Sequence, residues 1–146
     1  MKTTYERILK VAERNEGFPT KLITCSDDAV SFARQFYSDD IELYESFFLL
    51  LMNAQNKTIG YAKISQGGVV GTVVDVKIIC KYAVDTLANS VMIFHNHPSG
   101  NTRPSEQDKG MTEKVKQALT LLDCKLLDHI ILTTNSYFSF TDEGLL

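Results

Sequence analysis

Residues 90–108 read SVMIFHNHPSGNTRPSEQD and combine an apolar run, a polar loop and a helix start. The apolar run over 90–96 predicts a strand. Residues 98–104 are rich in Pro, Gly and Asn, and this composition indicates a loop. Ser105 is a typical N-cap residue, so we expect a helix from there to about residue 122. The stretch therefore predicts a strand, a tight loop and a helix in direct succession.

Strand and helix patterns alternate through the rest of the chain. Residues 46–52, SFFLLLM, are too short and too apolar for an exposed helix and indicate a buried strand. The other expected elements are a helix that begins near Ser26, a strand over 58–65, a helix over about 76–88 with Leu87 among its inward residues, and strands over 126–132 and 137–140. This alternation predicts an α/β fold with a mixed central β-sheet flanked by helices.

Length and composition fit one globular domain. The 146 residues contain no internal repeat, and we expect a short N-terminal extension over 1–19, with a helix over 3–15, before a single domain over 20–146. The apolar fraction of 44% and the charged fraction of 23% are typical of a soluble protein. No apolar run approaches the roughly 20 residues that cross a bilayer, and the N-terminus lacks a signal-peptide pattern. A cytoplasmic protein without a membrane association is therefore expected.

The charge balance argues against a nucleic-acid partner. The chain has 15 basic and 18 acidic residues, which gives a net charge of -3. Proteins that bind nucleic acids rely on basic residues that neutralise phosphates. A local basic patch stays compatible with this balance, because net charge says nothing about distribution.

His95 and His97 are the first candidates for a chemical role. Side chains of a strand alternate between its faces, so these two imidazoles should point the same way while Asn96 points to the opposite face. Two imidazoles on one face can bind the same zinc ion. Asn96 is therefore a poor candidate for a ligand.

A carboxylate follows at the start of the expected helix. Ser105 and Asp108 are three residues apart and face the same side of its first turn. Asp108 can supply a third ligand, and two His with one carboxylate leave a fourth position for water, as in catalytic zinc sites. The alternative is structural: Ser105 and Asp108 resemble a capping box, and His95 and His97 can be ordinary half-buried histidines.

The spacing His95-x-His97-x7-Ser105-x2-Asp108 matches the JAMM (MPN+) metalloprotease motif at every position. The wider run HNHPSGNTRPSEQD, with LLDHIIL at 126–132 and YFSFTDEGLL at the C-terminus, resembles the RadC branch of that superfamily. The resemblance covers about residues 20–146. It implies the JAB/MPN fold, which is similar to that of cytidine deaminases.

The resemblance also implies roles for the site residues. His95, His97 and Asp108 would hold one zinc ion, as in the family. A Glu on an earlier strand, which maps best onto Glu45, would handle the proton of the zinc-bound water. Ser105 would stabilise the tetrahedral intermediate.

Two glutamates compete for the role of the base. Alternation places Glu45 in phase with Phe47, Leu49 and Leu51, on one face of the expected strand. Glu42 falls out of phase and lies in the preceding turn. Glu45 is therefore preferred, and Glu42 stays the alternative.

Three functions are compatible with these residues. The first is zinc-dependent hydrolysis of peptide or isopeptide bonds, with a peptide or protein as the substrate. The second is a RadC-type DNA-repair protein or a metal-dependent nuclease. The contiguous letters of residues 95–97 do not support it, because HNH nucleases disperse those residues. The residues before the match are also too few for the helix-hairpin-helix region of full-length RadC proteins. The third function is a zinc-binding interaction module without catalysis.

His129 is the remaining histidine. It follows Asp128 inside an apolar strand, so we interpret it as a core histidine with a satisfied hydrogen bond. A supporting role behind a metal ligand is the alternative.

Overall fold

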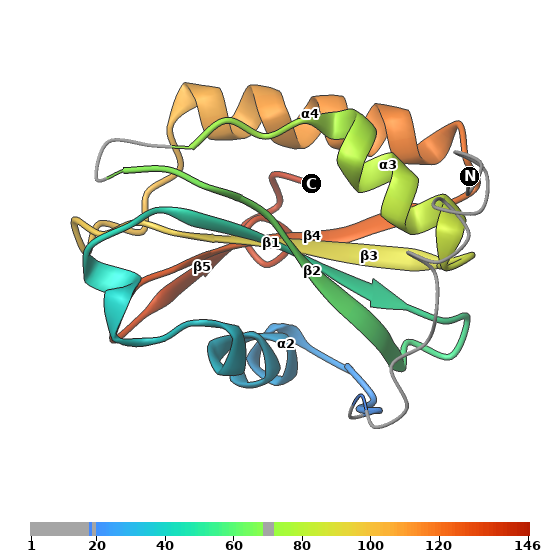
Figure 1. Ribbon diagram of the computed structural model, residues 1–146, viewed down its shortest axis with the longest axis horizontal. Helices are drawn as coiled ribbons and strands as arrows, with labels where there is room; N and C mark the ends of the chain where they lie inside the picture. Colours follow the sequence, from blue (N-terminus) through green and yellow to red (C-terminus); the bar gives the residue numbers. More distant parts are fainter. Residues whose placement is uncertain (1–17, 19, 69–71) are drawn as a thin grey trace, which may run out of the picture.

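The computed structural model describes residue 18, residues 20–68 and residues 72–146. Within these ranges a central sheet lies between one helix on one face and two helices on the other (Figure 1). The helices are α2 (Ser26–Ala33), α3 (Val76–Asp85) and α4 (Glu106–Thr120), with two short 3-10 turns, η1 (Arg34–Phe36) and η2 (Asp39–Glu42). The strands are β1 (Ser46–Met52), β2 (Thr58–Gln66), β3 (Ser90–Asn96), β4 (Lys125–Leu132) and β5 (Tyr137–Ser139). The helix expected over 3–15 falls outside the described residues.

The five strands are ordered β2-β1-β3-β4-β5 in the sheet. β3 and β4 run parallel and are joined through α4, whereas the other neighbouring pairs are antiparallel. A parallel pair requires a crossover connection, and a helix usually provides it. The α/β fold with a mixed sheet and flanking helices is confirmed.

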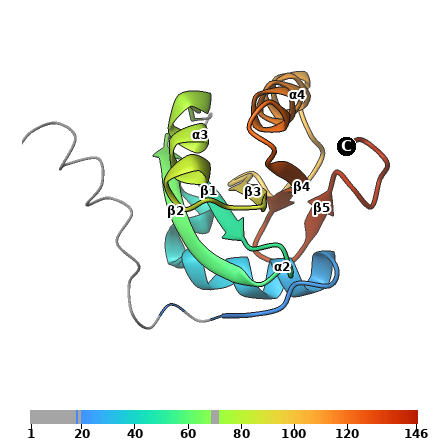
Figure 2. The same ribbon diagram turned by 90° about the vertical axis from the view of Figure 1, so that its right-hand side faces the viewer.

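The sheet is covered on both faces, as the view along the layers shows (Figure 2). Phe48, Leu50 and Met52 of β1 pack with α2, whereas the intervening residues of the same strand pack with α3 and α4. All seven residues of β1 and all seven of β3 are buried. Burial on both faces explains why these strands are apolar without interruption.

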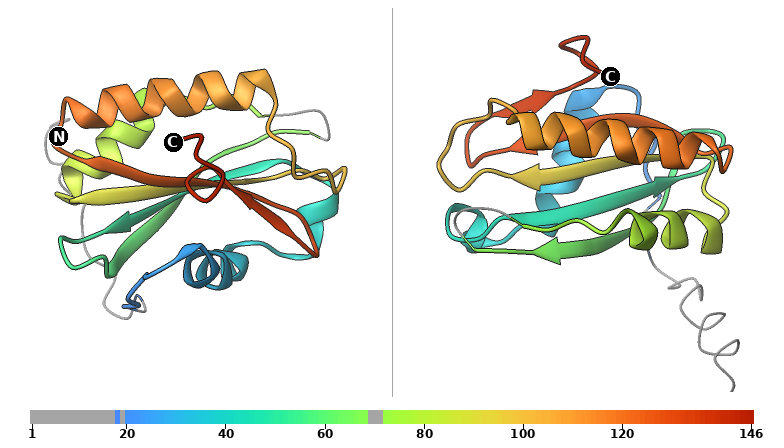
Figure 3. Two further views of the ribbon diagram at one scale, coloured as in Figure 1. Left: turned by 180° about the vertical axis from the view of Figure 1, so that it is seen from behind. Right: turned by 90° about the horizontal axis from the view of Figure 1, so that it is seen from above.

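Helix α4 lies lengthwise over the sheet with α3 packed beside it (Figure 3). Its N-terminus therefore meets the end of β3, where the chain leaves the sheet through residues 97–105. On the other side of β3, Phe47 of β1 is paired with His95. The strand end, the helix start and the beginning of β1 thus converge at one corner of the domain.

Two helices end earlier than the sequence predicts. Helix α3 ends at Asp85 rather than near residue 88, and α4 ends at Thr120 rather than at 122. Just after α3, Leu87 adopts a left-handed φ of 52°, and the N–H of Ala88 donates to the carbonyl of Ala83, which closes the helix. The expectation that Leu87 points inward was wrong, because its position past the helix end leaves it 86% exposed.

The described helices contain 8, 10 and 15 residues. None of them has both the length and the apolar character that a membrane crossing requires. The cellular compartment stays a prediction.

Candidate metal centre

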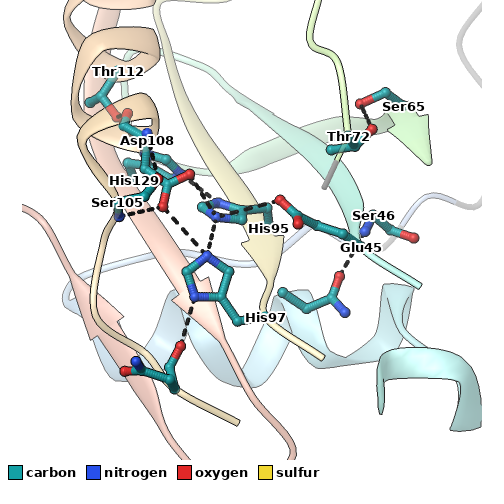
Figure 4. A network of polar contacts seen from close by, with 12 residues as sticks. Glu45, Ser46, Ser65, Thr72, His95, His97, Ser105, Asp108, Thr112 and His129 are labelled. Carbon is teal, nitrogen blue, oxygen red and sulfur yellow. Dashed lines mark hydrogen bonds and ion pairs between the residues drawn. The ribbon is translucent and has the colours of Figure 1, made fainter. Parts of the chain in front are cut away.

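His95 and His97 lie at the carboxyl end of β3 and point to the same side (Figure 4). The N–H of His97 donates to the carbonyl of Leu132, so the chain keeps its strand direction up to that residue. The two Nε2 atoms are 2.9 Å apart. The expected alternation of the strand is confirmed, and it brings the two imidazoles together.

Two carboxylates face these imidazoles. Asp108 is in the first turn of α4, with Oδ1 3.3 Å from Nε2 of His95 and Oδ2 3.4 Å from Nε2 of His97. Oε1 of Glu45 is 3.9 Å from Nε2 of His95. Glu45, His95 and His97 each offer one donor atom within 4.8 Å of the others, so they are positioned to bind a metal ion. Asp108 lies closer to His95 than Glu45 does, and its distances fit the same role.

The start of α4 holds the carboxylate of Asp108 in place. The N–H of Ser105 donates to Oδ2 of Asp108 at 2.8 Å, and the N–H of Asp108 donates to Oγ of Ser105 at 3.0 Å. The expected capping box is therefore present. It does not compete with the site, because a carboxylate accepts several hydrogen bonds and Oδ1 remains directed at His95. The cap orients the carboxylate toward the imidazoles.

Glu45 precedes β1 by one residue and still takes part in the sheet pairing. Its carbonyl accepts from the N–H of Gly67 at 2.8 Å. Extending the pairing of Phe47 with His95 by two residues on each strand places Glu45 opposite His97. Glu42 lies in η2, where its Oε1 accepts from the hydroxyl of Thr134 at 2.8 Å. The structure thus brings Glu45, and not Glu42, to the histidines.

The residue between the two histidines supports Glu45 from the opposite face. Nδ2 of Asn96 donates to the carbonyls of Ile41 and Tyr44 at 2.7 and 2.8 Å, and its Oδ1 accepts from the N–H of Ser46 at 2.8 Å. Asn96 is fully buried. The amide therefore fixes the backbone on both sides of Glu45.

The chemistry of the donor atoms fits a cation. Nδ1 of His97 is 2.7 Å from the carbonyl of Asn101, and a carbonyl can only accept, so Nδ1 carries the proton. In the neutral ring, Nε2 then presents a lone pair toward His95 and the carboxylate oxygens of Asp108. Lone pairs and negative oxygens that converge on one point are stabilised by a metal ion between them.

Burial and charge shift the titration of these groups in opposite directions. Burial acts to raise the pKa of Asp108, but the close imidazoles of His95 and His97 and the hydrogen bond from the Ser105 N–H hold it well below its ordinary value. The carboxylate of Asp108, which stabilises the protonated form of the ring, raises the pKa of His97. Burial raises the pKa of Glu45, against the opposing charge of His95. Asp108 is therefore ionised throughout the physiological range, as a ligand requires.

These residues form one wall of a cavity of about 700 Å³. The other walls come from β1, the segment before α3, the loop after β3 and α4, and they combine apolar side chains such as Phe47, Val74 and Met111 with polar ones such as Gln107 and Lys114. Thr72 ties the segment before α3 to β2, because its hydroxyl donates to Oγ of Ser65 at 2.9 Å. The predicted site residues therefore face a space that can admit a substrate.

Two further residues contact the site. The sequence did not predict the first, Thr112, and it predicted the second, His129, mainly as a core residue. Thr112 was not predicted to point inward, yet it is buried one turn after Asp108. That spacing of four residues on one helix was the available signal. His129 is a core histidine with both ring nitrogens bonded, as expected, and burial lowers its pKa well below the ordinary value. One of its partners is His95, so it supports the site directly.

Sequence comparisons agree with this geometry. A profile of the RadC-like JAB domain matches residues 23–145. A UPF0758 protein of Flavobacterium johnsoniae is 43% identical over 126 residues, which cover 86% of this chain and 54% of that protein. A UPF0758 protein of Porphyromonas gingivalis is 48% identical over 103 residues, 70% of this chain and 45% of its own length. A third, from Coprothermobacter proteolyticus, is 37% identical over 135 residues, 91% and 57% of the two chains. The chain spans about half the length of the curated relatives it matches.

Proposed function

The chain belongs to the RadC-like JAB domain family, and from this premise we propose that it is a zinc-dependent hydrolase of peptide or isopeptide bonds. His95, His97 and Asp108 would hold the ion, Glu45 would act as the general base, and Ser105 would stabilise the oxyanion. A bound zinc ion supplies acidification of a water molecule and polarisation of the substrate carbonyl. A peptide or protein is the substrate class in this proposal.

The separations among the donor atoms of three residues carry the proposal. Ligands about 2.0–2.1 Å from a tetrahedral zinc ion lie about 3.3–3.4 Å from one another. Oδ1 of Asp108 is 3.3 Å from Nε2 of His95, its Oδ2 is 3.4 Å from Nε2 of His97, and the two imidazole nitrogens lie closer together, 2.9 Å apart. These distances support a set of three protein ligands with one position left for water.

The longer distance of Glu45 favours a role as base. Its Oε1 is 3.9 Å from Nε2 of His95, farther than Oδ1 of Asp108 at 3.3 Å. A carboxylate beside the ligand set can take a proton from the attacking water and deliver it to the leaving amine. Burial raises the pKa of Glu45 and brings it closer to the range in which a base both accepts and returns a proton.

Ser105 retains a proton to donate. Its Oγ accepts from the N–H of Asp108, so the capping box uses a lone pair and not the hydroxyl hydrogen. Among the described residues no acceptor for that hydrogen is found, and Ser105 borders the cavity. A hydroxyl donor in this place can stabilise the negative oxygen that develops when water attacks a carbonyl.

Glu45→Gln tests the proposal, with Glu42→Gln as the matched control. Zinc-loaded protein is incubated with a fluorogenic peptide library and with isopeptide-linked peptides. We expect Glu45→Gln to lower turnover about 100- to 10,000-fold while zinc affinity stays unchanged. Glu42→Gln should behave as wild type. Full activity of Glu45→Gln would contradict the role of base, and a large loss of zinc would instead make Glu45 a ligand.

The zinc and turnover measurements, with a DNA-binding assay added, distinguish the two other functions. Zinc binding without hydrolysis of any library member would favour a metal-binding module. DNA binding in a mobility-shift assay, with a steep dependence on salt, would favour a DNA-associated role.

A further inference from the structure

A second histidine lies behind His95 in the core of the domain. Nδ1 of His95 is 2.7 Å from Nε2 of His129, which comes from β4. One of these two nitrogens must carry the proton of the hydrogen bond. The choice matters for the metal site, because a neutral imidazole with its proton on Nδ1 has its lone pair on Nε2.

The hydrogen bond at the other ring nitrogen of His129 determines which nitrogen carries the proton. Nδ1 of His129 is 2.6 Å from Oγ1 of Thr112, and that hydroxyl donates its only hydrogen to the carbonyl of Asp108 at 2.6 Å. Thr112 can therefore only accept from His129, so the proton of His129 is on Nδ1. Its Nε2 is then an acceptor, and the proton of the next hydrogen bond belongs to Nδ1 of His95.

We propose that Thr112 and His129 form a hydrogen-bond relay that sets the tautomer of His95 and directs the lone pair of its Nε2 at the metal. The two residues are positioning residues, because they act through His95. The relay starts at the backbone carbonyl of Asp108 and ends opposite the carboxylate of the same residue. Asp108, at the helix start, thus also anchors the hydrogen-bonded side chains that position His95.

Burial makes this relay difficult to replace by water. His95, Thr112 and His129 are 1%, 2% and 0% exposed. The ring of His129 stacks on Phe140, with centroids 4.5 Å apart and planes at 14°. A buried polar group that loses its partner here keeps the full cost of desolvation. The hydrogen bonds must therefore come from these side chains.

Thr112→Val and Thr112→Ser are a matched pair for the test. Val preserves the shape of the side chain and removes the acceptor, whereas Ser restores a hydroxyl. We expect Thr112→Val to weaken zinc binding about 10- to 100-fold, as loss of an outer partner of a metal ligand does. Thr112→Ser should bind zinc within about threefold of wild type. Zinc affinity is measured by competition with a chelating dye, and the melting temperature of each chelator-treated variant reports any general loss of stability.

Nuclear magnetic resonance gives a readout that a merely structural role would not change. Long-range ¹H–¹⁵N spectra of the zinc-loaded wild type should place the protons of both His95 and His129 on Nδ1. The Thr112→Val variant should lose the protected Nδ1 proton of His129. A wild-type proton on Nε2 of His129, or unchanged zinc affinity in Thr112→Val, would overturn the relay.

His129→Phe provides a second route, because Phe can keep the stacking on Phe140. Residues that act as one unit have non-additive effects. The double variant with Thr112→Val should therefore bind zinc no more weakly than His129→Phe alone. Additive losses would show two independent packing effects and contradict the relay.

The relay rests on the metal site of the proposed function but not on hydrolysis. Affinity and tautomers are measured with zinc alone and without a substrate. Failure of peptide cleavage would leave the relay intact, and a wrong tautomer would leave the hydrolase proposal intact.

Discussion

His95 and His97 present the same nitrogen to the same point, but one is supported from the core and the other from a surface loop. The side chain of His95 is 1% exposed, and its Nδ1 bonds to a side chain 34 residues away, in the core. The side chain of His97 is 17% exposed, and its Nδ1 bonds to the backbone carbonyl of Asn101, four residues away in a surface loop. One imidazole is therefore held by the fold as a whole and the other by its own loop.

The difference has an energetic consequence. A loop carbonyl that moves can be replaced by water, because the hydrogen bond of His97 lies near solvent. A core partner that is lost leaves an unpaired polar group in the interior. Substitutions on the core side should therefore cost more metal affinity than substitutions on the loop side. The predictions below test this ranking in order of decreasing effect on zinc affinity.

Asp108 contacts both histidines, so its loss should have the largest effect. We expect Asp108→Ala to weaken zinc binding by more than about 100-fold, since outer partners alone contribute about 10- to 100-fold. Zinc added at 100 times its dissociation constant should stabilise the wild type by about 2.7 kcal/mol, and the variant should lose this gain. Metal analysis and thermal unfolding with and without a chelator measure both effects.

The capping box requires a control for this variant, because Asp108→Ala also removes a helix cap. Ser105→Ala breaks one bond of the cap and keeps the carboxylate. It should cost about 1 kcal/mol of stability and leave zinc bound. Equal zinc content in Asp108→Ala and wild type would remove Asp108 from the ligand set.

The loop side of the site could be predicted from the sequence because its determinants are local. Strand alternation in β3, the Pro and Gly after it, and the cap at Ser105 all lie within residues 90–108. Each of these signals depends on neighbours a few residues away, and each is present in the structure. The position of Glu45 next to the histidines was also predicted correctly, because alternation extends across the start of β1.

The core side could not be predicted, because it depends on the register of two strands. β3 and β4 are parallel, and a register shift after Val91 places His129 beside Ile93. No pattern in the sequence predicts that register shift, so the contact between His129 and His95 could not be predicted from neighbouring residues. The early ends of α3 and α4 were not predicted either, because the residues with left-handed backbone just after them are not of the type that usually adopts it. Leu87 and Asp123 adopt left-handed φ values without being glycine.

Gly100→Ala tests the loop side. Gly100 has a φ of +83°, its N–H donates to the carbonyl of His97, and an added Cβ would meet no atom within 4 Å. The cost should therefore come from backbone strain alone, about 1 kcal/mol. We expect zinc affinity to fall about fivefold, less than for Thr112→Val.

Gly144→Ala is the matched control, since Gly144 also has a positive φ of +70° and open surroundings. Its stability should fall by a similar amount while its zinc affinity stays that of wild type. The comparison between the two supports would be wrong if Gly100→Ala cost more zinc affinity than Thr112→Val.

Asn96→Ala should change zinc affinity least, by no more than about twofold, because Asn96 lies between the two histidines but faces away from them. Its loss leaves buried carbonyl and N–H groups unpaired, so stability should fall by about 2–4 kcal/mol. Turnover of any peptide that the wild type cleaves should fall further than zinc binding, because the backbone on both sides of Glu45 is released. Circular dichroism melts, zinc titrations and initial rates separate these effects.

Asn53→Ala is a control for general destabilisation, because Asn53 accepts two backbone hydrogen bonds in the β1–β2 turn. It should lose stability and keep both zinc and turnover. A parallel loss of zinc and turnover in Asn96→Ala would mean that the amide supports the whole corner rather than the base. If the two losses separate, alternation in one strand serves both tasks: His95 and His97 present their imidazoles on one face, and Asn96 fixes the backbone around Glu45 from the other.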